Sequence, residues 1–250
     1  MTLTITPVIG IPPVSPGDDL AGLLLTALDR MPLRLADDDI VVLCQKVVSK
    51  AEGRIARLAE VVPSVFARRI AAHTTDKDPR IVEVILRETQ RIVRMDRGHL
   101  VVETGPGWVC ANAGIDESNS LAPDTVILLP ADPDASARRL REAIRERAGA
   151  IVAVLITDTW GRPWRDGLVD FAIGIAGMDA MLDLRGQTDM TGRELHHTVM
   201  AQADALAAAA GLAMKKGDGI PAVVVRGHAF ARCEGSASTL IRAKELDLFR

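Results

Sequence analysis

Residues 150–167 read AIVAVLITDTWGRPWRDG and join an apolar run to a polar one. The apolar run, residues 150–156, has the length and uniform apolarity of a strand that is buried on both faces of a sheet. The polar run, residues 157–167, concentrates Asp, Thr, Arg and Trp. It follows the end of the strand, where α/β proteins usually carry their active-site loops. The segment therefore predicts a sheet core with a functional loop at one end.

Other apolar segments extend this core in both directions. Strands are expected at residues 40–48, 91–95, 99–103, 108–111, 125–129 and 220–225. Helices are expected at residues 18–30, 65–72, 79–89, 132–147, 195–212 and 239–249. The two element types do not alternate strictly, which favours a mixed α/β (α+β) fold over a Rossmann fold. The sequence has no P-loop, no Gly-x-Gly-x-x-Gly motif and no visible linker, so residues 1–250 are expected to form a single module, with two intertwined lobes as one possibility.

The composition argues against several classes of protein. Lys and Arg number 30 and Asp and Glu 33, a net charge of −3, and only 3% of residues are aromatic. A nucleic-acid binder needs clustered positive charge or stacking rings, so no nucleic-acid partner is expected. The three scattered cysteines form neither a metal motif nor a disulfide framework, and no run is long enough to span a bilayer. These features predict a cytoplasmic protein without a membrane segment.

Two polar segments are candidates for metal and phosphate chemistry. Residues 112–119, NAGIDESN, follow a predicted strand and offer Asp116 together with amide and backbone groups, which suit a hard cation or a phosphate. Considered alone, an Asx-type turn explains this segment better. In the second segment, Asp158 suits Mg²⁺ or Mn²⁺, and the planar guanidinium groups of Arg162 and Arg165 suit phosphates or carboxylates. A packed surface loop with Arg stacked on Trp is the alternative.

Two lysine-bearing segments are weaker candidates. Lys50 follows the strand predicted at residues 40–48 and can neutralise a phosphate, although a single Lys is usually a solvated charge. Residues 215–221, KKGDGIP, form a Gly-rich turn that can cradle a phosphate, but turns from a helix to a strand are often Gly-rich.

Taken together, the motifs resemble one family. They are residues 10–12 with 16–20, 46–54, 78–80, 109–119, 157–167, and 219–221 with 226–227, and they cover nearly the whole chain. In this order they are similar to the coenzyme F-420:L-glutamate ligases, also called gamma-glutamyl ligases. The resemblance implies a GTP-dependent ligase that adds L-glutamate to the deazaflavin coenzyme precursor with Mg²⁺ or Mn²⁺ and K⁺. It also implies a homodimer, and the length of 250 residues predicts the ligase without the C-terminal flavin domain of some bacterial relatives.

The resemblance also assigns roles to individual residues. Asp116 and Asp158 would hold one divalent ion, and Thr159 would contribute to a second. The residues expected around GTP are Ile11, Pro12, Pro13, Val14, Gln45, Lys50, Asn119 and Lys216. At Gln45 many relatives carry a small hydroxyl residue. At Lys216 they often carry a neutral polar one near the second metal, and because a protonated Lys cannot ligate a cation, this Lys is expected to replace that ion's charge or to point away.

The chemistry of amide formation agrees with this interpretation. A carboxylate must be activated, and its attack on the γ-phosphate of GTP would give an acyl phosphate that the amine of glutamate then displaces. Such a reaction needs charge neutralisation and alignment more than a protein nucleophile, and Arg162 and Arg165 are predicted to supply part of both. Two alternatives stay open, a ligase for another phosphorylated carboxylate and a non-catalytic GTP- or metal-binding sensor with the same fold.

Overall fold

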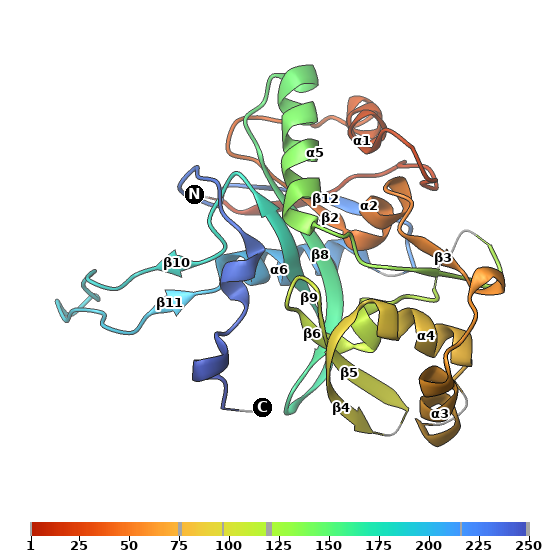
Figure 1. The fold of residues 1–250 in the computed structure, drawn as a ribbon. Helices are drawn as coiled ribbons and strands as arrows, with labels where there is room; N and C mark the ends of the chain where they lie inside the picture. The colour runs from red at the N-terminus through yellow and green to blue at the C-terminus, as the bar shows by residue number, and fades with distance from the viewer. Residues whose placement is uncertain (1, 75–76, 97, 119–121, 216, 249–250) are drawn as a thin grey trace. The chain divides into compact units, whose positions relative to one another are not determined.

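The computed structural model describes residues 2–74, 77–96, 98–118, 122–215 and 217–248 (Figure 1). The chain divides into two compact units. Unit 1 comprises residues 1–12, 21–44 and 133–242, and unit 2 comprises residues 13–20, 45–132 and 243–250. The predicted mixed α/β fold is confirmed. Among the described residues, no helix combines the length and the apolarity that a bilayer crossing requires.

Unit 1 is built on a five-stranded sheet with the strand order β1-β12-β2-β8-β9. The strands are β1 (Thr4–Pro7), β2 (Ile40–Cys44), β8 (Ala153–Arg162), β9 (Arg165–Ala176) and β12 (Ala222–Arg226). Among the described strands of this sheet, β2 and β8 alone pair in parallel, and β2 is buried from Ile40 to Leu43, as its uniform apolarity predicts.

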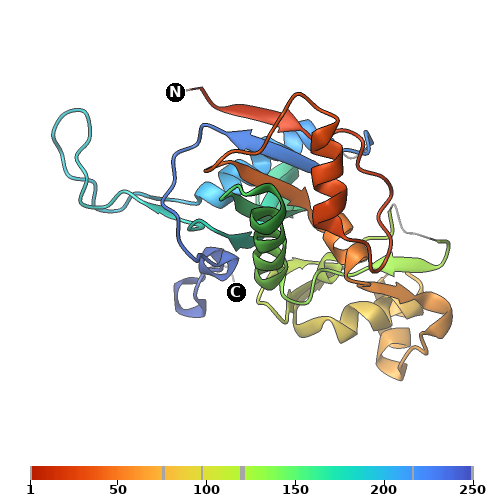
Figure 2. The same ribbon diagram turned by 90° about the horizontal axis from the view of Figure 1, so that it is seen from above.

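Three helices accompany this sheet: α1 (Leu20–Asp29), α5 (Pro133–Ala148) and α6 (Gln202–Met214) (Figure 2). Gly174 of β9 lies so close to the backbone of Pro133 in α5 that a side chain there would overlap it. Asp170 of the same strand lies against Gly211 of α6. A register shift separates Asp170 from Gly174, so the two residues point to opposite faces of the sheet, one toward each helix.

Unit 1 also carries a narrow two-stranded arm, formed by β10 (Leu182–Asp183) and β11 (Val199–Met200) (Figure 1). The helix predicted at residues 195–212 begins only at Gln202, because residues 199–200 pair with β10. The C-terminal helix predicted at residues 239–249 is also wrong. Its described part contains the short 3-10 turns η3 (Ala237–Leu240) and η4 (Lys244–Leu246), and η4 belongs to unit 2.

Unit 2 has a core of its own between short sheets and small helices. The strands are β3 (Ile55–Arg57) with β7 (Thr125–Ile127), and β4 (Thr89–Asp96), β5 (His99–Thr104) and β6 (Val109–Ala111). The helices are α2 (Gln45–Ala51), α3 (Val65–Thr74) and α4 (Pro79–Arg87), with the 3-10 turns η1 (Leu58–Glu60) and η2 (Asn112–Gly114). Residues from α3, α4, β5 and β7 form this core, including Val82, Ile85, Leu100 and Val102.

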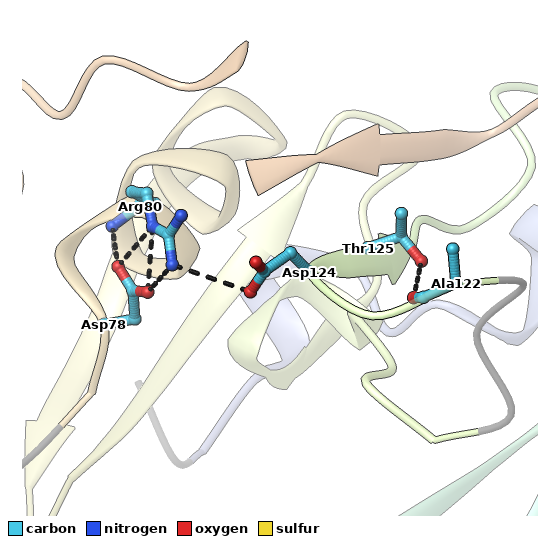
Figure 3. Close-up of polar contacts among 5 residues, drawn as sticks. All are labelled: Asp78, Arg80, Ala122, Asp124 and Thr125. Carbon is cyan, nitrogen blue, oxygen red and sulfur yellow. Dashed lines mark hydrogen bonds and ion pairs between the residues drawn. The ribbon is translucent and has the colours of Figure 1, made fainter. Parts of the chain in front are cut away.

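Helix α4 illustrates how the sequence fixes a local structure. Asp78 caps its N-terminus by accepting a hydrogen bond from the backbone N–H of Arg80 at 2.8 Å, and proline stands in the first turn. The guanidinium of Arg80 lies between two carboxylates, at 2.5 Å from Asp78 and 3.8 Å from Asp124 (Figure 3). This side-chain hydrogen bond lowers the pKa of Asp78, although burial opposes the shift. The Asp-Pro-Arg motif at residues 78–80 therefore has a structural role at the start of α4.

Candidate functional site

The segment at residues 40–48 is not one strand. Strand β2 ends at Cys44, and helix α2 begins at Gln45, so the prediction of a strand through Val48 is wrong. In the helix, Gln45 and Ser49 lie one turn apart and are both buried, and the Ser49 hydroxyl donates to Gln45 Oε1 at 2.8 Å. Gln45 Nε2 is buried and has no hydrogen-bond partner among the described residues. A buried amide without a partner is costly, so this N–H group is available to a ligand oxygen.

A neighbouring face of α2, about 100° away around the helix, carries two lysines. Lys46 and Lys50 are four residues apart, so they lie on the same stripe of the helix. Lys46 Nζ forms an ion pair with Asp116 Oδ2 at 2.7 Å and donates to Ser118 Oγ at 2.8 Å. Lys50 is partly buried. The sequence singled out Lys50, which follows the strand expected at residues 40–48, and assigned no role to Lys46, which lies within that expected strand.

Asp116 is fixed by the backbone on both of its sides. Its N–H donates to the carbonyl of Ile127 at 3.0 Å, and its carbonyl accepts from the N–H of Ile127 at 2.9 Å. Asp116 Oδ1 accepts from the N–H of Ser118 at 2.7 Å, which is the Asx-type turn that the sequence allowed. Burial opposes ionisation, but the hydrogen bonds from Lys46 and Ser118 outweigh it and lower the pKa of Asp116. The carboxylate is therefore charged at neutral pH.

The turn that precedes Asp116 has an uncommon backbone. Asn112, Ala113 and Gly114 all have left-handed φ angles, 53°, 56° and 67°. Ala113 is 2% exposed, and a Cβ at Gly114 would lie 2.7 Å from Leu129 Cδ1. Left-handed backbone costs roughly 1–2 kcal/mol for a residue with a Cβ, and such strain gathers at functional sites. The Asn-Ala-Gly-Ile-Asp motif is thus a strained turn that leads into a charged carboxylate.

In unit 1, residues 157–167 form strand rather than a loop. Strands β8 and β9 continue through this segment as a hairpin, and only Pro163 and Trp164 connect them, Trp164 with a φ of 58°. The predicted loop is therefore wrong, because alternating polar and aromatic residues here occupy the two faces of a ribbon. Trp160 stacks on Phe171 with ring centroids 5.9 Å apart.

Successive side chains of a strand point to opposite faces, which separates Asp158 from Thr159, the two metal ligands predicted in this hairpin. Asp158 Oδ2 accepts from Trp160 Nε1 at 2.7 Å, so these two side chains share one face. Thr159 lies on the other face, where its hydroxyl donates to Asp170 Oδ1 at 2.5 Å. Asp170 was missed by the sequence analysis, since it belongs to a strand that was not predicted. The side chains of Asp158 and Thr159 therefore point to opposite faces of the hairpin.

The two arginines of the hairpin differ in their surroundings. Arg162 Nη2 donates to the carbonyl of Asp166 at 3.2 Å, while Arg162 Nε is buried without a hydrogen-bond partner in the described structure. Arg165 is exposed beside the turn. The unused Nε–H of Arg162 leaves this guanidinium able to bind an anion.

The remaining predicted residues are more scattered. Ile11 and Val14 are buried and Pro12 and Pro13 exposed, in a segment without regular secondary structure. Asn119 and Lys216 lie outside the described residues, so the predictions for them stay untested. Within the part of the chain that the structure describes, no three His, Cys, Asp or Glu side chains gather into a metal-binding group.

Comparison with known proteins identifies the family. The family model described as F420-0:gamma-glutamyl ligase matches residues 8–227. The chain belongs to this family. It is 45% identical to the coenzyme F420:L-glutamate ligase of Methanothermobacter thermautotrophicus, with all of both chains covered. It is 48% identical to that of Methanopyrus kandleri, covering all of this chain and 98% of the relative. The predicted family and enzyme class, a ligase that forms amide bonds, are thereby confirmed.

Proposed function

We propose that this ligase joins L-glutamate to the coenzyme F420 precursor through a γ-glutamyl amide bond, with GTP as co-substrate. The observation that carries the proposal is the charged group on unit 2, where the ionised Asp116 lies beside the lysine stripe of α2. A carboxylate that binds a cation and ammonium groups that bind phosphates are together what a metal–nucleotide complex requires. The names of the relatives, coenzyme F420:L-glutamate ligases, support glutamate and the F420 precursor as the other substrates.

The proposed reaction has two steps. A carboxylate oxygen of the precursor attacks the γ-phosphorus of GTP, the bond to the β,γ-bridging oxygen breaks, and GDP leaves. The amine of glutamate then attacks the acyl phosphate carbon, inorganic phosphate departs and the amine loses a proton. Lys50 neutralises phosphate charge, and Arg162 and Arg165 orient carboxylate or phosphate groups, as their planar forks allow. Gln45 donates its free amide N–H to GTP, together with contacts from Ile11 to Val14.

The donor set fits Mg²⁺ or Mn²⁺, since both prefer oxygen ligands. Mg²⁺ in particular is usually held by one or two carboxylates together with substrate phosphates. We assign Asp116 and Asp158 to one divalent ion and Thr159 to a second, in keeping with the opposite faces of Asp158 and Thr159. Such an ion, when bound, offsets the charge on the phosphate oxygens. K⁺ as a further cation and a homodimeric assembly complete the proposal.

Mass spectrometry tests the proposed reaction directly. The protein is incubated with GTP, Mn²⁺, K⁺, L-glutamate and the deazaflavin precursor, with parallel reactions that contain ATP or Na⁺ instead. We expect mass increments of one glutamyl unit, with GTP preferred. Binding of GTP without turnover would favour a sensor instead, and light scattering of the eluted protein tests the dimer.

A further inference from the structure

Both carboxylate oxygens of Asp116 accept from other groups of unit 2. Ser118 N–H donates to Oδ1 at 2.7 Å, and Lys46 Nζ lies 2.7 Å from Oδ2. The pair is largely shielded from solvent, with 19% of the Lys46 side chain and 24% of the Asp116 side chain exposed. The ammonium also donates to Ser118 Oγ at 2.8 Å, so it is held between two groups of the same turn.

A divalent ion at Asp116 would compete with this ammonium for the same oxygen. Mg²⁺ binds a carboxylate oxygen at about 2.1 Å, and two cations that share one oxygen repel each other strongly in a shielded site. The Lys46 ammonium must therefore leave Asp116 Oδ2 when the ion arrives. The flexible four-carbon stem of Lys46 permits this movement. In its new position, however, the charged ammonium needs another anionic partner.

We propose that Lys46 makes divalent-ion binding at Asp116 depend on the nucleotide. Without nucleotide, the ion has to displace an ammonium that gains no new partner. With nucleotide, phosphate oxygens receive the ammonium on the side of α2 that also carries Lys50. Lys46 is thus a specificity-determining residue of the ion site, which selects the metal–nucleotide complex over the free metal. The inference rests on the proposed function, because it assumes that Asp116 is a metal ligand.

Binding of Mn²⁺ to the whole chain, measured by titration calorimetry and by the electron paramagnetic resonance of free Mn²⁺, tests the inference. Lys46→Met keeps most of the aliphatic stem and removes the charge. Without nucleotide, we expect this variant to bind Mn²⁺ about tenfold more tightly than the unmodified protein, within the usual range of coupling between two sites. The enhancement of Mn²⁺ binding by GDP should shrink by the same factor. Unchanged or weaker binding of free Mn²⁺ in the variant would overturn the inference.

Two further variants separate this inference from the proposed function. Lys244→Met is the matched control, because Lys244 pairs with the carboxylate of Glu103 at 3.6 Å in the same unit, and its removal should leave Mn²⁺ binding unchanged. Asp116→Asn tests the ligand itself. If Asp116→Asn abolishes Mn²⁺ binding but Lys46→Met does not strengthen it, only the role of Lys46 fails. If Asp116→Asn leaves Mn²⁺ binding intact, the metal assignment fails and the inference with it.

Discussion

Substitution of Gly211 by alanine should destabilise the protein, although glycine-to-alanine changes in helices usually stabilise. Gly211 lies inside α6, where a Cβ would be 2.8 Å from Cγ of Asp170 and would overlap its Oδ2. The Asp170 carboxylate would have to move, and its 2.5 Å hydrogen bond from Thr159 would be lost or lengthened.

The expected change in the free energy of unfolding is the sum of one stabilising and two destabilising effects. The intrinsic helix preference of alanine over glycine favours the variant by about 1 kcal/mol. Overpacking of a well-packed site costs about 1–3 kcal/mol, and loss of a hydrogen bond to a charged group costs about 1.5–3 kcal/mol more. The free energy of unfolding should therefore fall by roughly 1–4 kcal/mol, allowing for partial relaxation of the carboxylate.

A double-mutant cycle in urea denaturation isolates the effect. In an Asp170→Ala background the overlapping Cγ and Oδ2 are gone and only the Cβ of residue 170 remains, at 3.3 Å, so Gly211→Ala should raise the free energy of unfolding by up to about 1 kcal/mol. Ala205→Gly, at an exposed position of the same helix, measures the intrinsic helix preference of alanine over glycine in this context. It should lower the free energy of unfolding by the amount that this preference contributes. Stabilisation by Gly211→Ala in the unmodified protein would refute the argument that Asp170 occupies the space of a missing Cβ.

Four other outcomes are expected. Asp158→Asn should abolish glutamate addition in the mass-spectrometric assay with an unchanged circular dichroism spectrum, and near-normal turnover with unchanged Mn²⁺ affinity would remove Asp158 from the metal site. Lys50→Ala should weaken GTP and GDP binding by calorimetry while guanine stays preferred over adenine; lost base preference at unchanged affinity would place Lys50 near the base. Gly114→Ala should lower the free energy of unfolding by about 2–5 kcal/mol, from left-handed strain and overlap with Leu129, and a loss below 1 kcal/mol in urea would contradict this. Burial raises the pKa of the Asp204 carboxyl in the folded protein above its pKa in the unfolded chain. The stability that the protonated carboxyl contributes is therefore present at acidic pH and is lost as the pH rises through the pKa of the folded protein. Asp204→Asn should therefore gain stability relative to the unmodified protein at pH 7 but not at pH 3, and an equal difference at both pH values would rule the effect out.

The sequence predicted the fold class and the family but not every element boundary. The helix at residues 79–89 was identified because an Asp-Pro start is a local signal, and the structure has α4 at Pro79–Arg87. Uniform apolarity located the strand at residues 150–156 only in part, since β8 runs over Ala153–Arg162. Residues 40–48 are apolar except for Gln45 and Lys46, and such a segment does not distinguish a strand from a strand followed by a helix. The start of α2 at Gln45 therefore depends on tertiary packing.

The candidate site was predicted unevenly for the same reason. Asp116, Asp158 and Lys50 lie in recognisable polar motifs, so the sequence singled them out. Lys46 pairs with Asp116 because it lies in helix α2, and the two residues are 70 positions apart in the chain. Asp170 pairs with Thr159 only through the β8–β9 register, and no local pattern shows which residues of a hairpin face each other.

The left-handed turn at residues 112–114 restricts which sequences can evolve here. Most single substitutions of a buried alanine change only volume, but at Ala113 every larger side chain would also have to adopt a disfavoured backbone. Asn112 has more freedom, because asparagine and aspartate tolerate this conformation better than other residues with a Cβ. A library randomised over these three positions and selected for folding should therefore recover few variants, rich in glycine and asparagine, whereas the exposed positions of α5 should accept almost any polar residue.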